Sequence, residues 1–576
     1  MWARYAMAGL MLLGGSTAFA QGTADPAAVD YIFVDGRPVH LTEIKDAPFY
    51  RIQGNSKMAQ TESVREPLRR VMGITAVHNG PDELAFRKSA EMAGAARESI
   101  ARLTRIQEAD QLRVFTTDGG RTLLVEYPEI ILQCDETTTL AEVQQYLRTH
   151  YQVTVEPTRL RRGQFLVRLL TPSHTLWLAN QLKSTTAIPV RYADVNFWFA
   201  QPSGNNPPRF PQQWSALPGA GLPADPGFAD QWALENRASR PGALAGADTG
   251  FARAYRIAPL DASGIKVAVL DYAIDVDHPE LMGAIDSVFN ATRYDTRKGM
   301  NDPALKQLDF VEQPEAEADH GTACAGIIAA LTSNKIGVSG VASGAKIVAI
   351  QISTPGVEDL KIVSGLTIIA ALQAAQAAQA QIVSLSWALR LPSHEALDSV
   401  RAEINSMNAA RGNKGTLIVS AAGNEESLFQ PVLEPDFPAD YSDRAPNVIA
   451  AGASNWCGEA KRNGQCDMEV WTSRFNDHTL FAPGVDIFTI TNRRDKTTPN
   501  ALNNYRVNFN GTSAATPFIA AAAALVLKKH PDWTAAQVRQ HLMRTAGKLK
   551  GGDKAVLDIC NALYGVARCS SHANPP

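Results

Sequence analysis

Residues 264–271 read GIKVAVLD, a short and nearly continuous apolar run that ends in a carboxylate. Similar apolar runs recur further along the chain, at 346–350, 382–385, 416–419 and 448–450. Ala- and Leu-rich stretches of helical composition lie between several of them, at 361–379 and 394–411. Strands that are apolar on both faces and alternate with helices form parallel sheets covered by helices. The sequence therefore predicts an α/β region built on a parallel sheet.

Polar residues at the ends of these predicted elements are the candidates for chemistry, because reactive groups gather beyond the carboxyl ends of parallel strands. They are Asp271, His320 in DHGTACAG (319–326), Asn424 in AAGN (421–424) and Ser513 in NGTSAATP (510–517). Taken singly, each has an ordinary structural interpretation as a helix cap, a turn residue or a structural histidine. Together, in the order Asp, His, Asn, Ser, they match a nucleophilic triad with an oxyanion donor.

Two features narrow the kind of enzyme that this set of residues predicts. Ala515 stands where the last glycine of a G-x-S-x-G elbow would be, which argues against an α/β-hydrolase lipase or esterase. The motifs VLD, HGT-x-x-AG, AAGN and NGTSAATP make residues 225–550 resemble the subtilisin-like serine peptidases, the subtilase family. The HGT-x-C detail and QWALEN at 231–236 are similar to the kexin-like branch.

The resemblance implies a subtilisin-like fold, with a parallel sheet flanked by helices, and the activity of a serine endopeptidase that forms an acyl-enzyme. It makes Ser513 the nucleophile, His320 its general base and then acid, and Asp271 the group that orients the imidazole. Asn424 and the Ser513 backbone N–H would hold the oxyanion. The alternative is a subtilase-fold protein that binds peptides without catalysis.

The resemblance also implies a substrate-binding strand and pocket, and here the chain departs from the family pattern. Residues 382–388 resemble the strand that pairs with the substrate backbone, and the pocket would be walled by Ser386, Trp387, Ala388, Ala422 and Gly423. Ala388 replaces a glycine in this strand. The other departures are Tyr272 and Ala273 after the aspartate, Ser384 in place of Asn, Ala514 in place of Met and Phe518 in place of His.

We expect no cofactor to be required for the chemistry, and the metal-binding residues stay unknown at this stage. A structural calcium ion is an expectation from the resemblance. Glu280 and the loop 333–338 resemble a family calcium site made of a carboxylate and loop carbonyls, which are the hard oxygen ligands that calcium prefers. The alternative for this loop is a plain surface turn.

The N-terminal part of the chain has a different pattern. Residues 21–200 mix short strands and helices, including a helix from 140 to 150 and a strand from 190 to 199, which predicts a smaller α+β region. A Pro- and Gly-rich linker (201–224) precedes the peptidase-like region (225–550), and a C-terminal tail (551–576) follows it. The resemblance implies that the α+β region is a propeptide, an intramolecular inhibitor and chaperone, removed by self-cleavage within about 200–225.

The first twenty residues predict the compartment. Arg4, the apolar run 6–13 and the Ala-x-Ala at 18–20 are typical of a secretory signal peptide (1–20). The alternative, a membrane anchor, needs about 18–20 apolar residues, more than this run has. We therefore expect an exported protein, secreted or periplasmic. The formal net charge of −3 gives no electrostatic reason to expect nucleic acid as a partner.

Export permits disulfide bonds, and the chain has six cysteines. Cys457 with Cys466 and Cys560 with Cys569 are spaced to close small loops, with a zinc site as the alternative that their spacing disfavours. Cys134 has no obvious local partner, and Cys324 is predicted to be a buried free thiol.

Overall fold

The structure is a computed structural model, and it describes most of the chain from residue 31 onward. The described residues are 31–34, 37–43, 49–53, 75–78, 83–87, 109–116, 123–170, 174–202, 208–214, 221–308, 319–353, 360–389, 397–425, 435–458, 472–498, 500–550 and 552–570. The predicted signal peptide (1–20) therefore lies outside the described residues.

A nine-stranded sheet forms the centre of the C-terminal region, with the strand order β16-β17-β15-β19-β20-β22-β24-β28-β27. All of its neighbouring pairs are parallel except β27 with β28. The strands are β15 Lys266–Asp271, β16 Ile285–Asn290, β17 Lys346–Gln351, β19 Ile382–Leu385, β20 Leu417–Ala421, β22 Val448–Ser454, β24 Thr479–Pro483, β27 Gly547–Lys548 and β28 Ala555–Val556. The predicted α/β architecture with a parallel sheet is confirmed.

Both faces of the sheet are buried, which explains why its strands are continuous apolar runs. In β15, Val267 and Val269 point into one hydrophobic core, whereas Ala268 and Leu270 point into another. Helices α7 His320–Ala329 and α11 Thr512–Lys529 cover the first face, and α8 Gly365–Ala377 and α9 Asp398–Ser406 cover the second. The other α-helices of this region are α6 Phe251–Ile257, α10 Ala410–Asn413, α12 Ala535–Thr545, α13 Ile559–Tyr564 and α14 Val566–Ser570.

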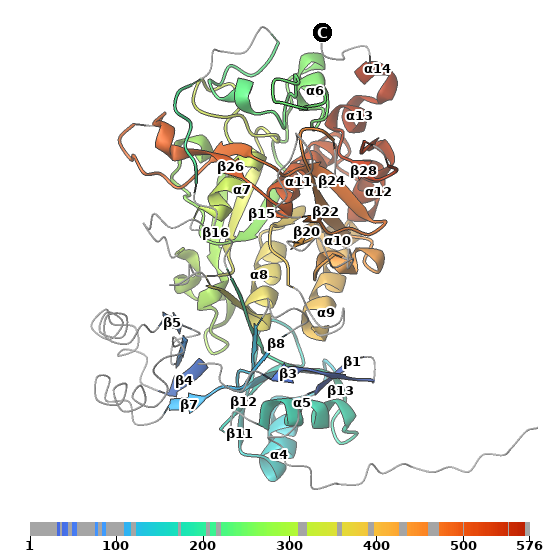
Figure 1. The fold of residues 1–576 in the computed structure, drawn as a ribbon. Helices are drawn as coiled ribbons and strands as arrows, with labels where there is room; N and C mark the ends of the chain where they lie inside the picture. The colour runs from blue at the N-terminus through green and yellow to red at the C-terminus, as the bar shows by residue number, and fades with distance from the viewer. Residues whose placement is uncertain are drawn as a thin grey trace, which may run out of the picture.

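The N-terminal region contains a β-α-β-β-α-β unit, the split βαβ arrangement. Its antiparallel sheet has the order β11-β12-β10-β13. The elements are β10 Glu129–Cys134, α4 Leu140–His150, β11 Val153–Pro157, β12 Gln164–Leu169, α5 Thr175–Ser184 and β13 Val190–Val195. Figure 1 shows this unit at one end of the molecule, with α8 and α9 between it and the central sheet. The predicted α+β character of this region is confirmed.

The chain changes sheets after β13, where the sequence predicts one strand over 190–199. The structure has a second strand, β14 Trp198–Pro202, in a five-stranded sheet of order β18-β14-β9-β8-β3. β14 pairs antiparallel with β18 Leu360–Ser364 of the C-terminal region, with Trp198 opposite Ser364 and Pro202 opposite Leu360. The C-terminal region therefore adds one strand, β18, to a sheet whose other four strands come from the N-terminal region.

The remaining strands form small sheets. They are β1 Tyr31–Val34, β2 Arg37–His40, β3 Thr42–Glu43, β4 Phe49–Gln53, β5 Thr75–His78, β6 Glu83–Arg87, β7 Ala109–Gln111, β8 Val114–Thr116, β9 Leu123–Val125, β21 Asn424–Glu425, β23 Thr472–Ser473, β25 Ile487–Ile490 and β26 Tyr505–Phe509. The β25–β26 hairpin is the one that matters for the site, because β26 leads directly into α11.

The last strands of the chain, β27 and β28, belong to the central sheet. The boundary predicted at residue 550 falls between β27 and β28, which pair with each other, and β28 also pairs with β24. Cys560 and Cys569 form the predicted disulfide bond. Cys457 is disulfide-bonded as well, whereas Cys466, its predicted partner, lies outside the described residues. Cys134 and Cys324 are buried free cysteines.

Candidate active site

The site is built around Asp271, the last residue of the central strand β15. Its carboxylate is buried, and Oδ1 accepts hydrogen bonds from the Tyr272 backbone N–H and from His320 Nδ1, both at 2.8 Å. His320 is the first residue of α7. A Cβ on Gly321 would lie 3.0 Å from the Tyr272 carbonyl oxygen, so glycine lets the first turn of α7 approach the end of the strand.

The His320 ring is enclosed by two aromatic side chains. Tyr272 presents its ring edge-to-face with a centroid separation of 5.8 Å, and Phe509, at the end of β26, does so at 5.1 Å. The imidazole is therefore fixed by one carboxylate and by two aromatic contacts, which restrict its orientation.

Ser513 is the second residue of α11, at the helix end where backbone N–H groups favour negative charge. Its Oγ donates to the Ser386 carbonyl at 3.0 Å, and Ser386 Oγ donates to the Ser513 carbonyl at 2.9 Å. Among the described residues, no hydrogen bond joins Ser513 Oγ to the imidazole. Hydrogen bonds of this kind often tighten only when substrate binds, so this arrangement is compatible with a resting state.

Cys324 lies between His320 and Ser513 and contacts both. Its Sγ lies 4.0 Å from His320 Nδ1 and donates to the Ser513 carbonyl at 3.8 Å. Asp271, His320 and Cys324 offer ligand-type atoms within 4.8 Å of one another. Burial raises the pKa of the Cys324 thiol well above its usual value, which favours the protonated thiol that donates to the Ser513 carbonyl. We therefore interpret the three residues as a hydrogen-bonded cluster.

Asn424 lies beside the start of α11. Its Oδ1 accepts from the Thr512 backbone N–H at 3.0 Å and from the Thr512 hydroxyl at 3.3 Å. A Cβ on Gly511 would lie 3.0 Å from Asn424 Nδ2, and Gly511 has a φ of +98°, so glycine is needed there on both counts. Because the amide oxygen is held by Thr512, Nδ2 is the end of the side chain that remains to donate to a ligand.

The residues predicted to bind substrate lie around the same place. Ser386, Trp387 and Ala388 directly follow β19, and Ser386 contacts Ser513 as described. The Gly423 backbone N–H donates to the Thr512 hydroxyl at 3.2 Å.

Gly423 also reveals a pair of residues that sequence reasoning missed. A Cβ there would lie 2.1 Å from Asp436 Oδ2, and Asp436 forms an ion pair with Arg474 at 3.2 Å. Both side chains are largely buried against the predicted pocket wall. They are distant from Gly423 in sequence, so no local pattern points to them.

Glu280 and the loop 333–338, which the sequence predicts as a calcium site, lie together in the structure, and Asp225, which the sequence analysis did not name, joins them. Asp225 accepts from the backbone N–H groups of Ser333 (2.8 Å) and Lys335 (3.1 Å), and Glu280 accepts from the Val338 N–H (2.9 Å) and from Asn334 Nδ2 (3.0 Å). Burial raises the pKa of Glu280 to about 8, and the nearby Asp225 charge adds to this shift. The two buried carboxylates beside this loop are hard oxygen ligands of the kind that calcium prefers, so their chemistry fits the ion.

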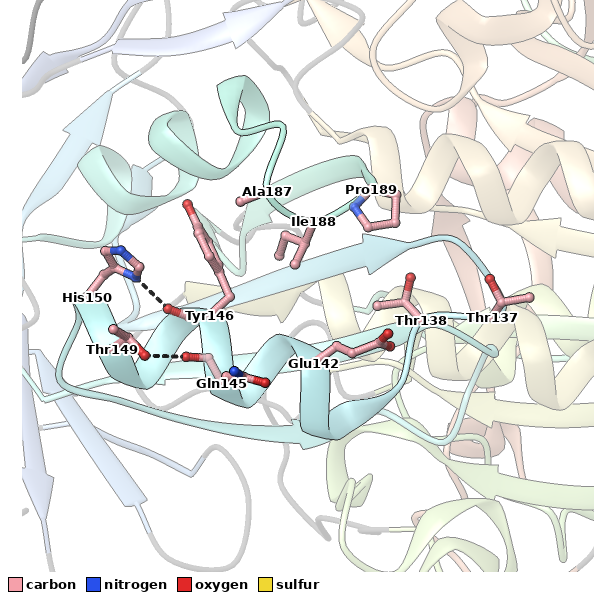
Figure 2. A pocket seen from close by; sticks show the side chains of 10 residues that line it. All are labelled: Thr137, Thr138, Glu142, Gln145, Tyr146, Thr149, His150, Ala187, Ile188 and Pro189. Carbon is pink, nitrogen blue, oxygen red and sulfur yellow. Dashed lines mark hydrogen bonds between the residues drawn. The ribbon is translucent and has the colours of Figure 1, made fainter.

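A separate surface pocket of about 510 Å³ lies in the N-terminal unit. Figure 2 shows it between α4 and residues 187–189, lined by polar side chains. Two of these, Thr149 and His150, hydrogen-bond to carbonyls of the preceding turn of α4. None of the site residues predicted from the sequence lines this pocket.

Comparison with known proteins identifies the family. The model of the subtilase family matches residues 262–566, just over half of the 576-residue chain. The chain is 32% identical to subtilisin E of Bacillus subtilis (strain 168) over 286 residues, which cover 49% of this chain and 61% of that protein. It is 31% identical to a subtilisin of Bacillus pumilus over 286 residues, 49% of this chain and 84% of that protein.

Among solved structures, fervidolysin from Fervidobacterium pennivorans, a keratinolytic enzyme related to subtilisin, has a similar fold. The TM-score is 0.51 at 19% sequence identity, and the match covers 78% of this chain and 62% of that one. The sheet order, the Asp271–His320 contact and these sequence matches agree, and the chain belongs to the subtilase family.

Proposed function

We propose that this protein is an exported serine endopeptidase that hydrolyses peptide bonds through Ser513, His320 and Asp271. The observation that carries this proposal is the 2.8 Å hydrogen bond between the buried Asp271 carboxylate and His320 Nδ1, with Cys324 in contact with both His320 and Ser513. The family membership of the chain supports the same reaction.

The proposed reaction begins with the hydroxyl of Ser513. A neutral hydroxyl attacks a peptide carbonyl poorly, so His320 Nε2 takes its proton as Oγ forms the bond to carbon. To reach the imidazole, the hydroxyl exchanges its hydrogen bond to the Ser386 carbonyl for one to Nε2. Asp271 holds the tautomer that has its proton on Nδ1 and stabilises the imidazolium. His320 then protonates the leaving amine, and water releases the acyl group by the same steps.

Negative charge develops on the substrate carbonyl oxygen in this reaction. Asn424 Nδ2 and the Ser513 backbone N–H are the donors that we assign to it, because Asn424 is anchored through its oxygen to Thr512. Ser386, Trp387, Ala388 and Gly423 are the residues that we assign to substrate binding.

The direct test is covalent labelling of the matured protein with a fluorophosphonate. We expect one adduct on Ser513, mapped by mass spectrometry, together with cleavage of casein. A folded, matured protein that binds peptides but neither labels nor cleaves them would instead support the non-catalytic alternative. Profiling the cleavage of a denatured proteome would then define the residue preferred before the scissile bond.

We also propose that the N-terminal region is an intramolecular inhibitor and folding assistant. Its side chains cap two helices of the peptidase region: Asp194 Oδ2 accepts from the Ser399 N–H of α9 at 2.6 Å, and Asn196 Oδ1 accepts from the Leu366 N–H of α8 at 3.1 Å. Arg161 adds an ion pair with Glu403 at 2.9 Å. The β14–β18 pairing anchors the end of this region.

Replacing Asp194 by alanine is expected to weaken this docking. Loss of a helix cap costs about 1 kcal/mol, and the α9 N-terminus would lose its buried acceptor. We expect a lower yield of folded protein and an earlier rise in casein hydrolysis during maturation. Asp135→Ala is the matched control, because Asp135 pairs with Arg191 on the exposed surface of the same region. Equal behaviour of the two variants would contradict the inhibitor proposal.

We propose that calcium binds at Asp225, Glu280 and the loop 333–338. When bound, it would neutralise the two carboxylates and fasten the loop; the peptide-bond chemistry does not require it.

We expect a chelator to lower the thermal midpoint of the wild-type protein by roughly 5–10 °C, given a large excess of calcium over its dissociation constant. Glu280→Gln should lose this calcium dependence. Asp277→Asn, which alters a carboxylate with a side chain 80% exposed, should keep it. A wild-type midpoint that is unchanged by chelator would exclude a stabilising calcium ion.

Export is proposed from residues 1–20. Among the residues that the structure describes, none of the helices combines the length and the apolarity that a membrane span requires. N-terminal sequencing of the exported protein tests cleavage after Ala20, provided that maturation is blocked by Ser513→Ala.

A further inference from the structure

A buried ion pair lies immediately beside the proposed general base. Arg506, on β26, donates from Nη1 to both carboxylate oxygens of Asp319, at 2.8 and 3.0 Å. The side chains are 3% and 5% exposed, respectively. Asp319 is the N-cap residue of α7 and directly precedes His320, but its side chain makes no capping hydrogen bond. The carboxylate therefore bonds to the β25–β26 hairpin and does not cap its own helix, α7.

The pair joins two elements that must be aligned for catalysis. α7 carries His320, and β26 leads through Gly511 into the helix that carries Ser513. The hydroxyl of Thr491, which follows β25, also donates to Asp319 Oδ2. Further along α7, the Thr489 hydroxyl of β25 donates to the Ala323 carbonyl at 3.0 Å. The start of α7 is thus fixed to both strands of the β25–β26 hairpin.

An aromatic ring completes the link to the imidazole. The Arg506 guanidinium lies over the Phe509 ring, 5.2 Å from its centroid, and the Phe509 ring lies edge-to-face with His320 at 5.1 Å. Arg506 therefore acts on His320 along two routes: through Asp319 and the backbone, and through Phe509.

We propose that Asp319 and Arg506 are positioning residues, which hold the His320 imidazole in line with Ser513. Because their charges cancel, the pair adds no net charge beside the imidazole. This inference rests on the proposed peptidase function. Removing one member would both loosen the imidazole and leave a buried charge beside it; removing both would only loosen it.

The other charged and titratable groups around His320 stay the same in these variants. They are Asp271 and Tyr272 at the end of β15, Cys324 on α7, and Asp275, which lies beside Thr322 and pairs with Arg493 at 2.8 Å. The Arg506 charge also acts on Cys324, which places it within electrostatic reach of the cluster.

The two single variants are expected to move the acid limb of the pH profile of kcat/KM in opposite directions. In Arg506→Met, the unpaired Asp319 carboxylate favours the imidazolium, so activity is lost at a higher pH as the pH falls. In Asp319→Asn, the unpaired Arg506 disfavours the imidazolium, so the limb moves to lower pH. Each shift should be on the order of half a pH unit. In both variants kcat should fall at least about tenfold, with KM nearly unchanged.

The double variant Asp319→Asn/Arg506→Met distinguishes the effect of an unpaired charge from the effect of a loosened imidazole. It also tests the proposal if a single variant fails to fold. Its acid limb should return to the wild-type pH, while kcat stays about tenfold low. The control is Arg253→Met/Asp558→Asn, which removes a partly buried pair of 2.8 Å between α6 and the N-cap of α13. The control double variant should lower the free energy of unfolding, but it should change neither kcat nor the pH of the acid limb of kcat/KM.

A readout without turnover distinguishes this inference from the proposed function. In the Ser513→Ala background, selectively ¹⁵N-labelled histidine reports the His320 titration, assigned by its absence in His320→Ala. The same opposite shifts are expected there, even if the protein proves not to be a peptidase. Titrations that coincide in the wild type and both single variants, or a double variant with wild-type kcat, would overturn the positioning role.

Discussion

Replacing Ser513 by alanine is expected to lower kcat for peptide hydrolysis by about a millionfold, the size of loss known for the nucleophile of the related enzyme subtilisin. The residual rate would come from the oxyanion donors and from substrate binding alone. The substitution removes only Oγ, whose observed contact is one hydrogen bond to the Ser386 carbonyl, so the fold should persist. Single-turnover hydrolysis of a chromogenic peptide, with circular dichroism as a check on folding, measures the effect.

The same variant tests maturation. We expect Ser513→Ala to retain its N-terminal region, whereas the wild type should acquire a new N-terminus within about 200–225. Ser386→Ala is the matched control: it removes a hydroxyl that contacts the Ser513 carbonyl, so its loss of kcat should stay within about tenfold. Identical mature N-termini in the wild type and in Ser513→Ala would refute self-cleavage.

Replacing Asp271 by asparagine is expected to lower kcat by about ten-thousandfold at neutral pH. Asparagine has nearly the same shape, but its amide can donate to Nδ1 and so favours the tautomer that places the imidazole proton toward Ser513. That tautomer cannot accept the proton of the hydroxyl. The imidazolium formed during attack also loses its buried counter-charge. The pH dependence of kcat and KM, measured separately, reports both effects.

Asp275→Asn is the control for this substitution. Asp275 is a buried carboxylate four residues further on, and it pairs with Arg493. We expect this variant to be less stable but to retain most of its kcat. Equal losses of kcat in the two variants would mean that Asp271 is structural, and the assignment of the triad would then be wrong.

Much of the fold was predictable because its signals are local. In β15 the consecutive residues Val267 and Ala268 enter different cores, so both must be apolar, and the strand is visible in the sequence as an unbroken run. Asp271, His320 and Ser513 stand at element ends, where the topology of a parallel sheet brings them together.

Other contacts had no local signal. The strand predicted over 190–199 is in fact divided between two sheets, because β14 finds its partner in β18 of the C-terminal region. Asp436 lies against Gly423, although nothing in either motif points to the other. The Asp319–Arg506 pair spans 187 residues of sequence.

The sequence by itself determined the class of the fold and which residues stand at the strand ends, because apolar periodicity and short motifs depend on neighbours a few residues apart. Only the tertiary structure decided what surrounds them: the Ser513 hydroxyl on the Ser386 carbonyl, the Asn196 amide and the Asp194 carboxylate that cap α8 and α9 from another region, and the ion pair behind His320. Such contacts join residues that are far apart in the sequence. They form only when the sheet, its helices and the N-terminal region pack against one another.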